Sequence, residues 1–203
     1  MSLHDLILRG GKAVTKSGIV EADVAITDGR ITAVEPDVEG QARTEMDAAS
    51  LHVLPGLIDP HVHFNELGRS HWEGFASGSR ALAAGGATTV FDMPLNAHPP
   101  TVDGPSFDLK LEAAEASSVV DFALWGGLVP GNVGRMEELA ERGVIGFKAF
   151  MSRSGTDDFP AADDLTLYEG MAEAARLGLP VAVHAENDGI TSALAHPART
   201  EDP

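Results

Sequence analysis

The sequence of 203 residues contains no cysteine. This absence excludes disulfide bonds and thiolate metal ligands, so a metal site in this chain must use histidine, aspartate, glutamate or a modified lysine. Basic residues are also scarce, with 14 lysines and arginines against 31 aspartates and glutamates and a formal net charge of −17. A nucleic-acid-binding surface needs the opposite balance, so we expect no nucleic-acid partner.

Long apolar runs are absent as well. No stretch approaches the roughly 20 apolar residues of a membrane-spanning helix, and the first residues lack the basic and apolar segments of a signal peptide. Hydrophobic residues make up 43% of the chain and charged residues 22%, as in globular proteins. We therefore expect no membrane association and a cytoplasmic location.

Lysine occurs at only four positions, which are Lys12, Lys16, Lys110 and Lys148. Lys148 lies inside the apolar run 144–151. Because lysine is almost never fully buried without a partner, this position needs an explanation. The side chain can reach the surface, it can pair with a buried acid, or it can have a chemical role.

Residues 1–51 have the pattern of a small β unit, a partial β-sandwich. Two pairs of short strands are predicted, and they flank turns at Gly10-Gly11 and at Asp28-Gly29. An Asp-Gly pair between alternating apolar runs is a strong hairpin signal. Residues 35–50 are polar and are expected to be irregular.

Residues 52–203 alternate between predicted strands and helices. Strands are predicted at 56–64, 88–93, within 119–129, at 144–151 and at 180–186. Helices are predicted at 72–84, 105–117, 132–142 and 163–177, followed by a polar loop with one helical turn.

Helical spacing also predicts which side chains of these helices face the core. Trp72 and Phe75 are expected on the inner face of the first helix, and Asn132 is expected to cap the third. The inner face of the last helix is predicted to carry Leu165, Tyr168, Ala172 and Ala175.

Repeated strand–helix units predict a parallel sheet, either a (β/α)₈ TIM-type barrel or an open doubly wound sheet. No glycine-rich nucleotide-binding fingerprint is present, and the polar candidates stand toward the carboxyl ends of strands, so the pattern favours the barrel. A full barrel needs eight strands and about 250 residues. About five strands are counted here, so we expect the amino-terminal portion of an incomplete barrel over 52–203, preceded by the β unit 1–51.

His61 and His63 stand two residues apart on the first strand of this region. Residues i and i+2 of a strand point the same way, so both imidazoles can reach one divalent metal. Without further support, two polar residues at a strand end explain the pattern equally well. Asp59 shares their face, either as a second-shell residue that orients a ligand or as a plain strand-end acid.

Lys148 and His184 extend this pair into a possible binuclear site. Desolvation disfavours the ammonium form, and a neutral lysine amine can add carbon dioxide to give a carbamate. A carbamate on Lys148 can bridge two metals, with His61 and His63 on one metal and His184 on the other. Water between the two cations would ionise near neutral pH.

At this point the sequence resembles the cyclic amidohydrolases, the dihydroorotase, hydantoinase and allantoinase branch of the metal-dependent amidohydrolase superfamily. The resemblance extends along essentially the whole chain and rests on five blocks in order, which are GLIDPHVH (56–63), GGATT (85–89), DMP (92–94), GFK (146–148) and VHAEN (183–187).

Within that branch, the segments 68–75, 93–96 and 146–151 look most like allantoinases. Dihydroorotases of similar pattern carry an arginine two residues after the second histidine, where it binds the substrate carboxylate. This chain has Asn65 there, which favours an uncharged ring. Allantoinases usually show Asn-Glu-Pro-Gly at this loop, whereas Leu67 replaces the proline here.

The resemblance implies hydrolysis of allantoin to allantoate by hydroxide activated between two divalent metals, expected to be Zn²⁺, with a carbamylated Lys148. It implies a small cyclic ureide substrate, a contact from Asn96, and a homo-oligomer, a dimer or a tetramer. The loop 152–158 is expected near the pocket. The family's catalytic aspartate and a fourth histidine lie on later strands, so no catalytic acid is assigned within these 203 residues.

Two other interpretations remain open. One is the same machinery acting on another ring, as in hydantoinases, dihydropyrimidinases or dihydroorotases. The other is a non-catalytic relative that serves as an assembly module, or an inactive fragment.

Overall fold

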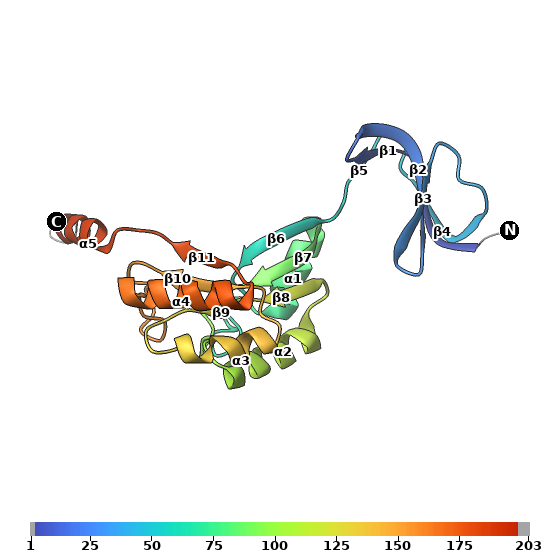
Figure 1. Ribbon diagram of the computed structural model, residues 1–203. Helices are drawn as coiled ribbons and strands as arrows, with labels where there is room; N and C mark the ends of the chain where they lie inside the picture. The colour runs from blue at the N-terminus through green and yellow to red at the C-terminus, as the bar shows by residue number, and fades with distance from the viewer. Residues whose placement is uncertain (1–2, 199–203) are drawn as a thin grey trace. The chain divides into compact units, whose positions relative to one another are not determined.

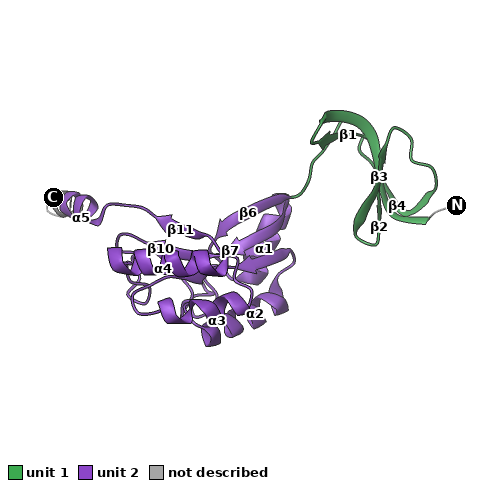
Figure 2. Ribbon diagram, viewed as in Figure 1, with its two compact units in different colours: residues 1–56 green, residues 57–203 purple. Residues whose placement is uncertain are grey.

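The computed structural model describes residues 3–198, and side chains are described up to residue 194. The chain divides into two compact units, Met1–Gly56 and Leu57–Pro203 (Figure 2). The predicted domain boundary after residue 51 is close to this division, and the domain assignment itself stays a prediction.

Unit 1 is a five-stranded sheet in the order β3-β2-β1-β4, with β5 also paired to β1 (Figure 1). The strands are β1 Leu3–Thr15, β2 Gly18–Thr27, β3 Arg30–Glu35, β4 Gln41–Asp47 and β5 His52–Val53. Asp28 and Gly29 both have positive φ, 51° and 69°, as a two-residue hairpin turn between β2 and β3 requires. This hairpin is confirmed, while a second layer that would make a sandwich stays a prediction.

Two predictions for unit 1 were wrong. Gly10-Gly11 is not a turn but an irregularity within the single long strand β1, where the register shifts between Leu8 and Gly11. Glycine is needed because a Cβ on Gly11 would lie 2.7 Å from Val53 Cγ2. Residues 35–50 contain β4, a mostly exposed edge strand without apolar alternation, so its pairing with β1 left no periodic signal.

The buried carboxylate of Asp23 holds this irregularity in place. It accepts hydrogen bonds from Gly10 N at 2.7 Å, from Arg9 Nη1 at 2.8 Å and from Val38 N at 3.3 Å. Burial alone would raise the pKa of Asp23, but these hydrogen bonds and the charge of Arg9 outweigh burial and hold the pKa below its usual value.

Unit 2 contains parallel strands that neighbour one another in sequence order. They are β6 Leu57–Val62, β7 Ala87–Asp92, β8 Asp121–Leu124, β9 Gly126–Gly127, β10 Phe147–Phe150 and β11 Val181–His184. Only Trp125 separates β8, which pairs with β7, from β9, which pairs with β10. The predicted alternation of strands and helices is thus confirmed, and closure into a barrel stays a prediction.

The helices are α1 Phe75–Ala84, α2 Gly104–Ser117, η1 Val133–Arg135, α3 Met136–Glu141, α4 Asp164–Leu177 and α5 Asp188–Ala198. Each helix from α1 to α4 contacts the next one (Figure 1). The main core lies between these helices and the strands, and its large members include Phe75, Phe107, Leu124, Leu139 and Phe147. None of the helices in the described residues is long and apolar enough to span a membrane.

The predicted inner face of α4 was wrong. Leu165 and Tyr168 are exposed, Tyr168 by 76%, and Ala172 and Ala175 are exposed too. The buried face carries Thr166, Gly170 and Ala174. The helix approaches the strands closely at Gly170, where an added Cβ would lie 2.5 Å from Leu128, and close approach selects small residues rather than large apolar ones.

Three further local predictions need correction. Trp72 lies outside α1 and is 57% exposed. Asn132 makes no helix cap, because its side chain binds the main chain of Val129, Val102 and Gly127. The segment after residue 187 contains the eleven-residue helix α5 rather than one helical turn.

Replacing Asp23 by alanine should destabilise unit 1. Three donors would lose a buried acceptor, so we expect the local free energy of opening to fall by about 2 kcal/mol. Amide hydrogen exchange in the intact gene product should show faster exchange at Gly10 and Val38. Because the folded pKa is lowered, this stabilisation is present above the ordinary aspartate pKa and should be lost as pH falls through the folded pKa. Unchanged protection at both amides, with wild-type pH dependence, would contradict the assignment.

Candidate metal centre

The predicted site residues lie in unit 2, on three of its strands or directly after one of them. His61 lies in β6 and His63 directly follows it, Lys148 lies within β10, and His184 is the last residue of β11. These strands belong to two three-stranded parallel sheets, β6-β7-β8 and β9-β10-β11, and within each sheet the carboxyl ends of the strands share an edge. His184 ends its strand, whereas Lys148 is the second of the four residues of β10. That the four side chains meet at one site stays a prediction.

His61 and His63 lie side by side, with ring centroids 5.4 Å apart. His63 Nδ1 lies 3.4 Å from the carbonyl oxygen of Leu95, on the loop after β7. The carboxylate of Asp59 accepts a hydrogen bond from the backbone N–H of His61 at 3.1 Å. Asp59 thus holds the main chain at this strand end, and its predicted role in orienting a metal ligand stays a prediction.

The electrostatic surroundings favour neutral imidazoles. Burial lowers the pKa of His61, and the nearby positive charges of Lys148 and His184 lower it further, against the charge of Asp59. Burial also lowers the pKa of His63, despite its contact with Leu95. Neutral imidazole is the form that binds divalent metals, so the lowered pKa values of both histidines favour the metal-binding form.

Lys148 is buried, with only 4% of its surface exposed. Desolvation lowers the pKa of its amine. Within the described residues, Nζ has no hydrogen-bond or ion-pair partner, and it lies 5.0 Å from the centroid of the Phe150 ring. The side chain therefore neither reaches the surface nor pairs with a buried acid, and the chemical interpretation of this lysine remains.

His184 contacts the same phenyl ring. Its imidazole stacks on Phe150 with centroids 4.7 Å apart and an interplanar angle of 7°. Its Nε2 lies 2.9 Å from Glu186 Oε1, and Glu186 also accepts a hydrogen bond from Ser152 Oγ. These two hydrogen bonds lower the pKa of Glu186. The Phe150 ring therefore lies near both Lys148 and His184, and the Nε2 atom of His184 is directed at Glu186.

Among the side chains that the structure describes, those of residues 3–194, no three histidines, aspartates or glutamates converge as a ready-made metal cage. A site built on these residues thus needs Lys148 as a ligand, which in turn needs an added group with metal-binding oxygens. The four predicted ligands lie on strands β6, β10 and β11 of two sheets or directly after them, and their roles as ligands stay predictions.

A protein-family profile described as "Amidohydrolase family" matches residues 52–202, well over half of the chain. The chain belongs to the amidohydrolase family. The family resemblance seen in the sequence motifs is thereby confirmed.

Curated relatives of this amidohydrolase are named allantoinases. The chain is 72% identical over 198 residues to an allantoinase of Rubrobacter xylanophilus, covering 98% of this chain and 43% of that protein. It is 61% identical over 197 residues to one of Solibacter usitatus, covering 97% of this chain and 43% of that protein. The chain thus spans less than half the length of the curated relatives it matches.

Solved structures of hydantoinases share its fold. The L-hydantoinase (dihydropyrimidinase) of Arthrobacter aurescens superposes with a TM-score of 0.91 at 34% identity, over 98% of this chain and 45% of that one. A D-hydantoinase structure superposes with a TM-score of 0.84 at 30% identity, over 97% of this chain and 43% of that one. A mixed α/β fold of the hydantoinase kind is therefore shown.

The donor set of this amidohydrolase fits a pair of divalent ions. Burial lowers the pKa of His61 and of His63, which favours their neutral forms, and Lys148 is a buried amine with a lowered pKa and no anionic partner among the described residues. An amine in that state can be carbamylated, which would supply two oxygens and a negative charge among imidazoles. Imidazole and carboxylate-like oxygen together suit zinc and similar cations.

Arg69 links loops that follow three of the strands of unit 2. It donates hydrogen bonds to the carbonyl oxygens of Asn96 at 2.9 Å and Ala97 at 3.3 Å, and its guanidinium also binds Asp158 Oδ2 at 3.2 Å. His98 Nδ1 shares that oxygen at 2.7 Å. The loops after β6, β7 and β10 are thus tied together, and Asn96 is held with a left-handed φ of 62°.

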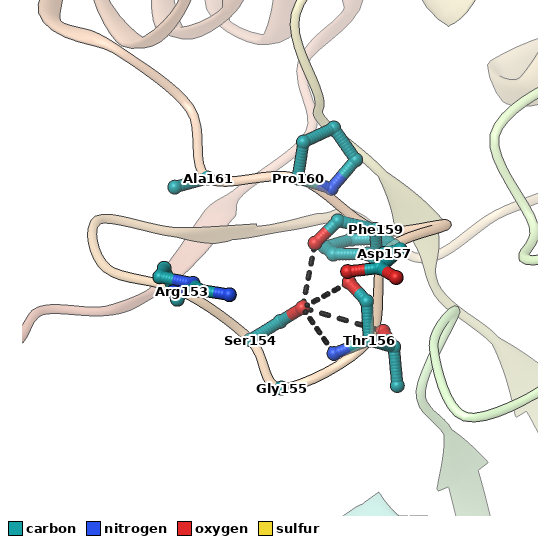
Figure 3. A pocket seen from close by; sticks show the side chains of 8 residues that line it. All are labelled: Arg153, Ser154, Gly155, Thr156, Asp157, Phe159, Pro160 and Ala161. Carbon is teal, nitrogen blue, oxygen red and sulfur yellow. Dashed lines mark hydrogen bonds between the residues drawn. The ribbon is translucent and has the colours of Figure 1, made fainter.

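The loop 152–158 and the residues after it line a small cavity of about 240 Å³, and the lining residues are 153–157 and 159–161 (Figure 3). Ser154 Oγ lies at its centre, 2.6 Å from Phe159 O and 3.3 Å from Thr156 N (Figure 3). The hydroxyl can donate to the carbonyl oxygen and accept from the amide. These contacts close the loop on itself, and its expected role beside the substrate stays a prediction.

The burial of Lys110 and its pairing with Asp92 were not predicted from the sequence. Its side chain is 1% exposed, like that of Asp92, and the two charged groups lie 2.5 Å apart. A signal was present in the sequence, because Lys110 stands three residues after Phe107 and four before Ala114, which are both buried on α2. The helical spacing therefore placed a lysine on an inward face.

Changing Arg69 to lysine should loosen the three loops. Lysine lacks the planar fork that binds two carbonyl oxygens and a carboxylate at once, and loss of charge-assisted hydrogen bonds corresponds to roughly tenfold faster local exchange or more. Hydrogen exchange measured by mass spectrometry on the intact gene product should report this in residues 94–101. Arg80→Lys is the matched control, since within the described part of the chain the Arg80 side chain binds only the carbonyl oxygen of Ala76, in its own helix. Equal exchange in both variants would show that Arg69 does not hold the loops.

Proposed function

We propose that the protein carrying this chain hydrolyses a cyclic amide, most directly allantoin to allantoate. The observation that carries the proposal is Lys148, a buried amine without an anionic partner in the described residues, on the strand beside that of His184 and close enough to His61 to lower the pKa of that imidazole. The similarity to proteins named allantoinase supports the choice of substrate. Because the chain covers 43% of those relatives, activity and substrate belong to the whole protein.

Two divalent ions, proposed to be Zn²⁺, would be held by these four side chains. His61 and His63 serve one ion, His184 the other, and Lys148 both. Divalent ions supply Lewis-acid polarisation of a carbonyl and a lowered pKa of water. The Nε2 atom of His184 is hydrogen-bonded to the carboxylate of Glu186. His184 could therefore bind a metal through Nε2 only after this hydrogen bond breaks.

Lys148 would act after carbamylation. The neutral amine nitrogen attacks carbon dioxide, a new N–C bond forms, and one proton leaves to solvent, so the product is a carbamate with one negative charge. The burial that lowers the pKa of Lys148 provides the neutral amine this step needs. Once formed, the charge would be balanced by the metals.

The residues near the site favour a neutral ring. Asn65 carries no charge with which to bind a substrate carboxylate. Its Oδ1 is buried and has no hydrogen-bond partner within the described residues, so an acceptor is available there for an N–H donor. Asn96, held by Arg69, is proposed as a second substrate contact.

Hydantoin or dihydropyrimidine hydrolysis is the second candidate. The similarity to the Arthrobacter aurescens hydantoinase, with a TM-score of 0.91, supports it. These rings share the cyclic amide and lack a carboxylate, so Asn65 does not distinguish them from allantoin.

The proposal includes the architecture around the site. A (β/α)₈ barrel begins in residues 52–203, a small β-sandwich includes residues 1–51, and the assembly is a cytoplasmic homo-oligomer. The sequential order of the parallel strands supports the barrel. No residue of this chain is proposed as the catalytic acid.

The intact gene product should turn over allantoin faster than hydantoin or dihydrouracil. We expect at least about a tenfold preference in kcat/KM, the size of effect that ring contacts in a polar site can supply. Release of the ring-opened acid measured with each substrate at equal enzyme concentration tests this. Removal of divalent ions by a chelator should abolish turnover, and added Zn²⁺ should restore it. A preference for dihydrouracil would replace allantoin by the second candidate.

Changing Lys148 to methionine should remove the metals while preserving the fold. Methionine keeps the apolar stem but cannot be carbamylated, so bound metal should fall from about two ions per chain to one or none. Metal analysis gives that ratio, and ¹³C-labelled carbon dioxide should give a carbamate resonance in proteins that keep Lys148 and none in Lys148→Met. Lys16→Met, on the exposed turn between β1 and β2, is the matched control. A carbamate signal that persists in Lys148→Met would place the modification elsewhere.

A further inference from the structure

A second buried lysine lies close to the candidate site and has a different environment from Lys148. Lys110 on α2 forms an ion pair of 2.5 Å with Asp92 at the end of β7, and each side chain is 1% exposed. Lys110 Nζ also donates a hydrogen bond to the carbonyl oxygen of Met93 at 2.6 Å. The pair is therefore enclosed by the core and tied to the main chain.

Stability alone does not account for such a pair. Taking two charges out of water is costly, and replacing a buried ion pair by apolar side chains of similar volume is often neutral or favourable. Removing one partner only, in contrast, leaves a charge unpaired in the core. A buried pair is therefore explained best by what its fixed geometry does for its neighbours.

The geometry of Asp92 acts on the strand that carries the histidines. Asp92 Oδ1 accepts a hydrogen bond of 2.8 Å from the backbone N–H of Phe64, the residue directly after His63. Directly after β7, the N–H of Met93 donates a hydrogen bond to the carbonyl oxygen of Val62 at 2.9 Å. Together these contacts fix the main chain on both sides of His63.

The same segment also reaches the ring of His63. The loop that begins at Met93 places the Leu95 carbonyl oxygen 3.4 Å from His63 Nδ1. Since Lys110 holds the Met93 carbonyl, α2 sets where this loop departs from β7. The direction in which His63 presents its other nitrogen thus depends on contacts made by Asp92 and Lys110.

We infer that Asp92 is a positioning residue, whose carboxylate oxygen fixes the main chain around His63 through the Phe64 N–H and thereby the geometry of metal binding by His61 and His63. This inference rests on the proposed function. Lys110 balances the charge of that carboxylate in the core and holds the Met93 carbonyl, and its share in the positioning is smaller than that of the acceptor at position 92.

Two double variants separate positioning from charge. Asp92→Asn with Lys110→Met removes both charges and keeps an oxygen that can accept from Phe64. Asp92→Leu with Lys110→Met removes the charges and the acceptor. Leu139→Ala is the matched control, because it opens the core at a fully buried residue of α3 without touching these contacts. Thermal unfolding of all three gives the loss of stability against which metal binding is compared.

Affinity for Co²⁺, followed by its d–d absorption, and for Zn²⁺, by competition with a chelator, is measured on the metal-free intact gene product. We expect the leucine double variant to bind 10- to 100-fold more weakly than wild type, the range typical for residues that orient metal ligands. The asparagine double variant and Leu139→Ala should stay within about threefold, and the ligand-field spectrum should change only in the leucine variant.

Outcomes for the inference and for the proposed function are distinguishable. A wild-type protein that binds neither Co²⁺ nor Zn²⁺ overturns the proposed metal site itself. Wild-type binding with equal affinity in the leucine variant overturns the positioning role and leaves the site intact. Equal weakening in the leucine variant and in Leu139→Ala, with an unchanged spectrum, also overturns it, because a general loss of stability then explains the effect.

Discussion

The hydrogen bond from the Phe64 N–H to the Asp92 carboxylate is the contact on which the candidate site depends most directly. It joins the ends of two neighbouring parallel strands at the point where the ladder stops and where the functional side chains begin. A carboxylate can hold that place in the core only if its charge is matched, and Lys110 supplies the match from α2. The helix layer, the sheet and the histidines are thus coupled through one buried charge pair.

The two buried lysines of this chain show how surroundings decide chemistry. Lys110 has an anionic partner and a carbonyl acceptor, so its ammonium form is satisfied and its role is structural. Lys148 has an aromatic ring nearby and no acidic partner among the described residues. No nearby negative charge therefore offsets burial, which lowers the pKa of its amine. The same residue type is therefore a fixed cation at one position and a potential nucleophile toward carbon dioxide at the other.

Much of the fold could be predicted from the sequence, because many of its strands and helices have one apolar and one polar face. Such elements leave a pattern of alternating or helically spaced apolar residues. The edge strand β4 and the inner face of α4 escaped that approach, since β4 is mostly exposed and has no apolar alternation, and α4 packs through Gly170. The site histidines and Lys148 were evident from spacing and from an unusual residue in an apolar run. The partner of Lys110 was not, because the contact joins residues 18 positions apart through the tertiary fold.

Fold and chemistry carry different information about substrate. This chain superposes closely on a hydantoinase at 34% identity and matches a protein named allantoinase at 72% identity, and a shared framework does not fix which ring is bound. Under the proposed function, the histidines and the lysine that this framework presents would serve any cyclic amide. Discrimination must then come from the loops beyond the strand ends, where Asn65 and Asn96 both adopt left-handed backbone conformations. Holding non-glycine residues there costs free energy, and the ties made by Arg69 to the carbonyl of Asn96 help to offset it.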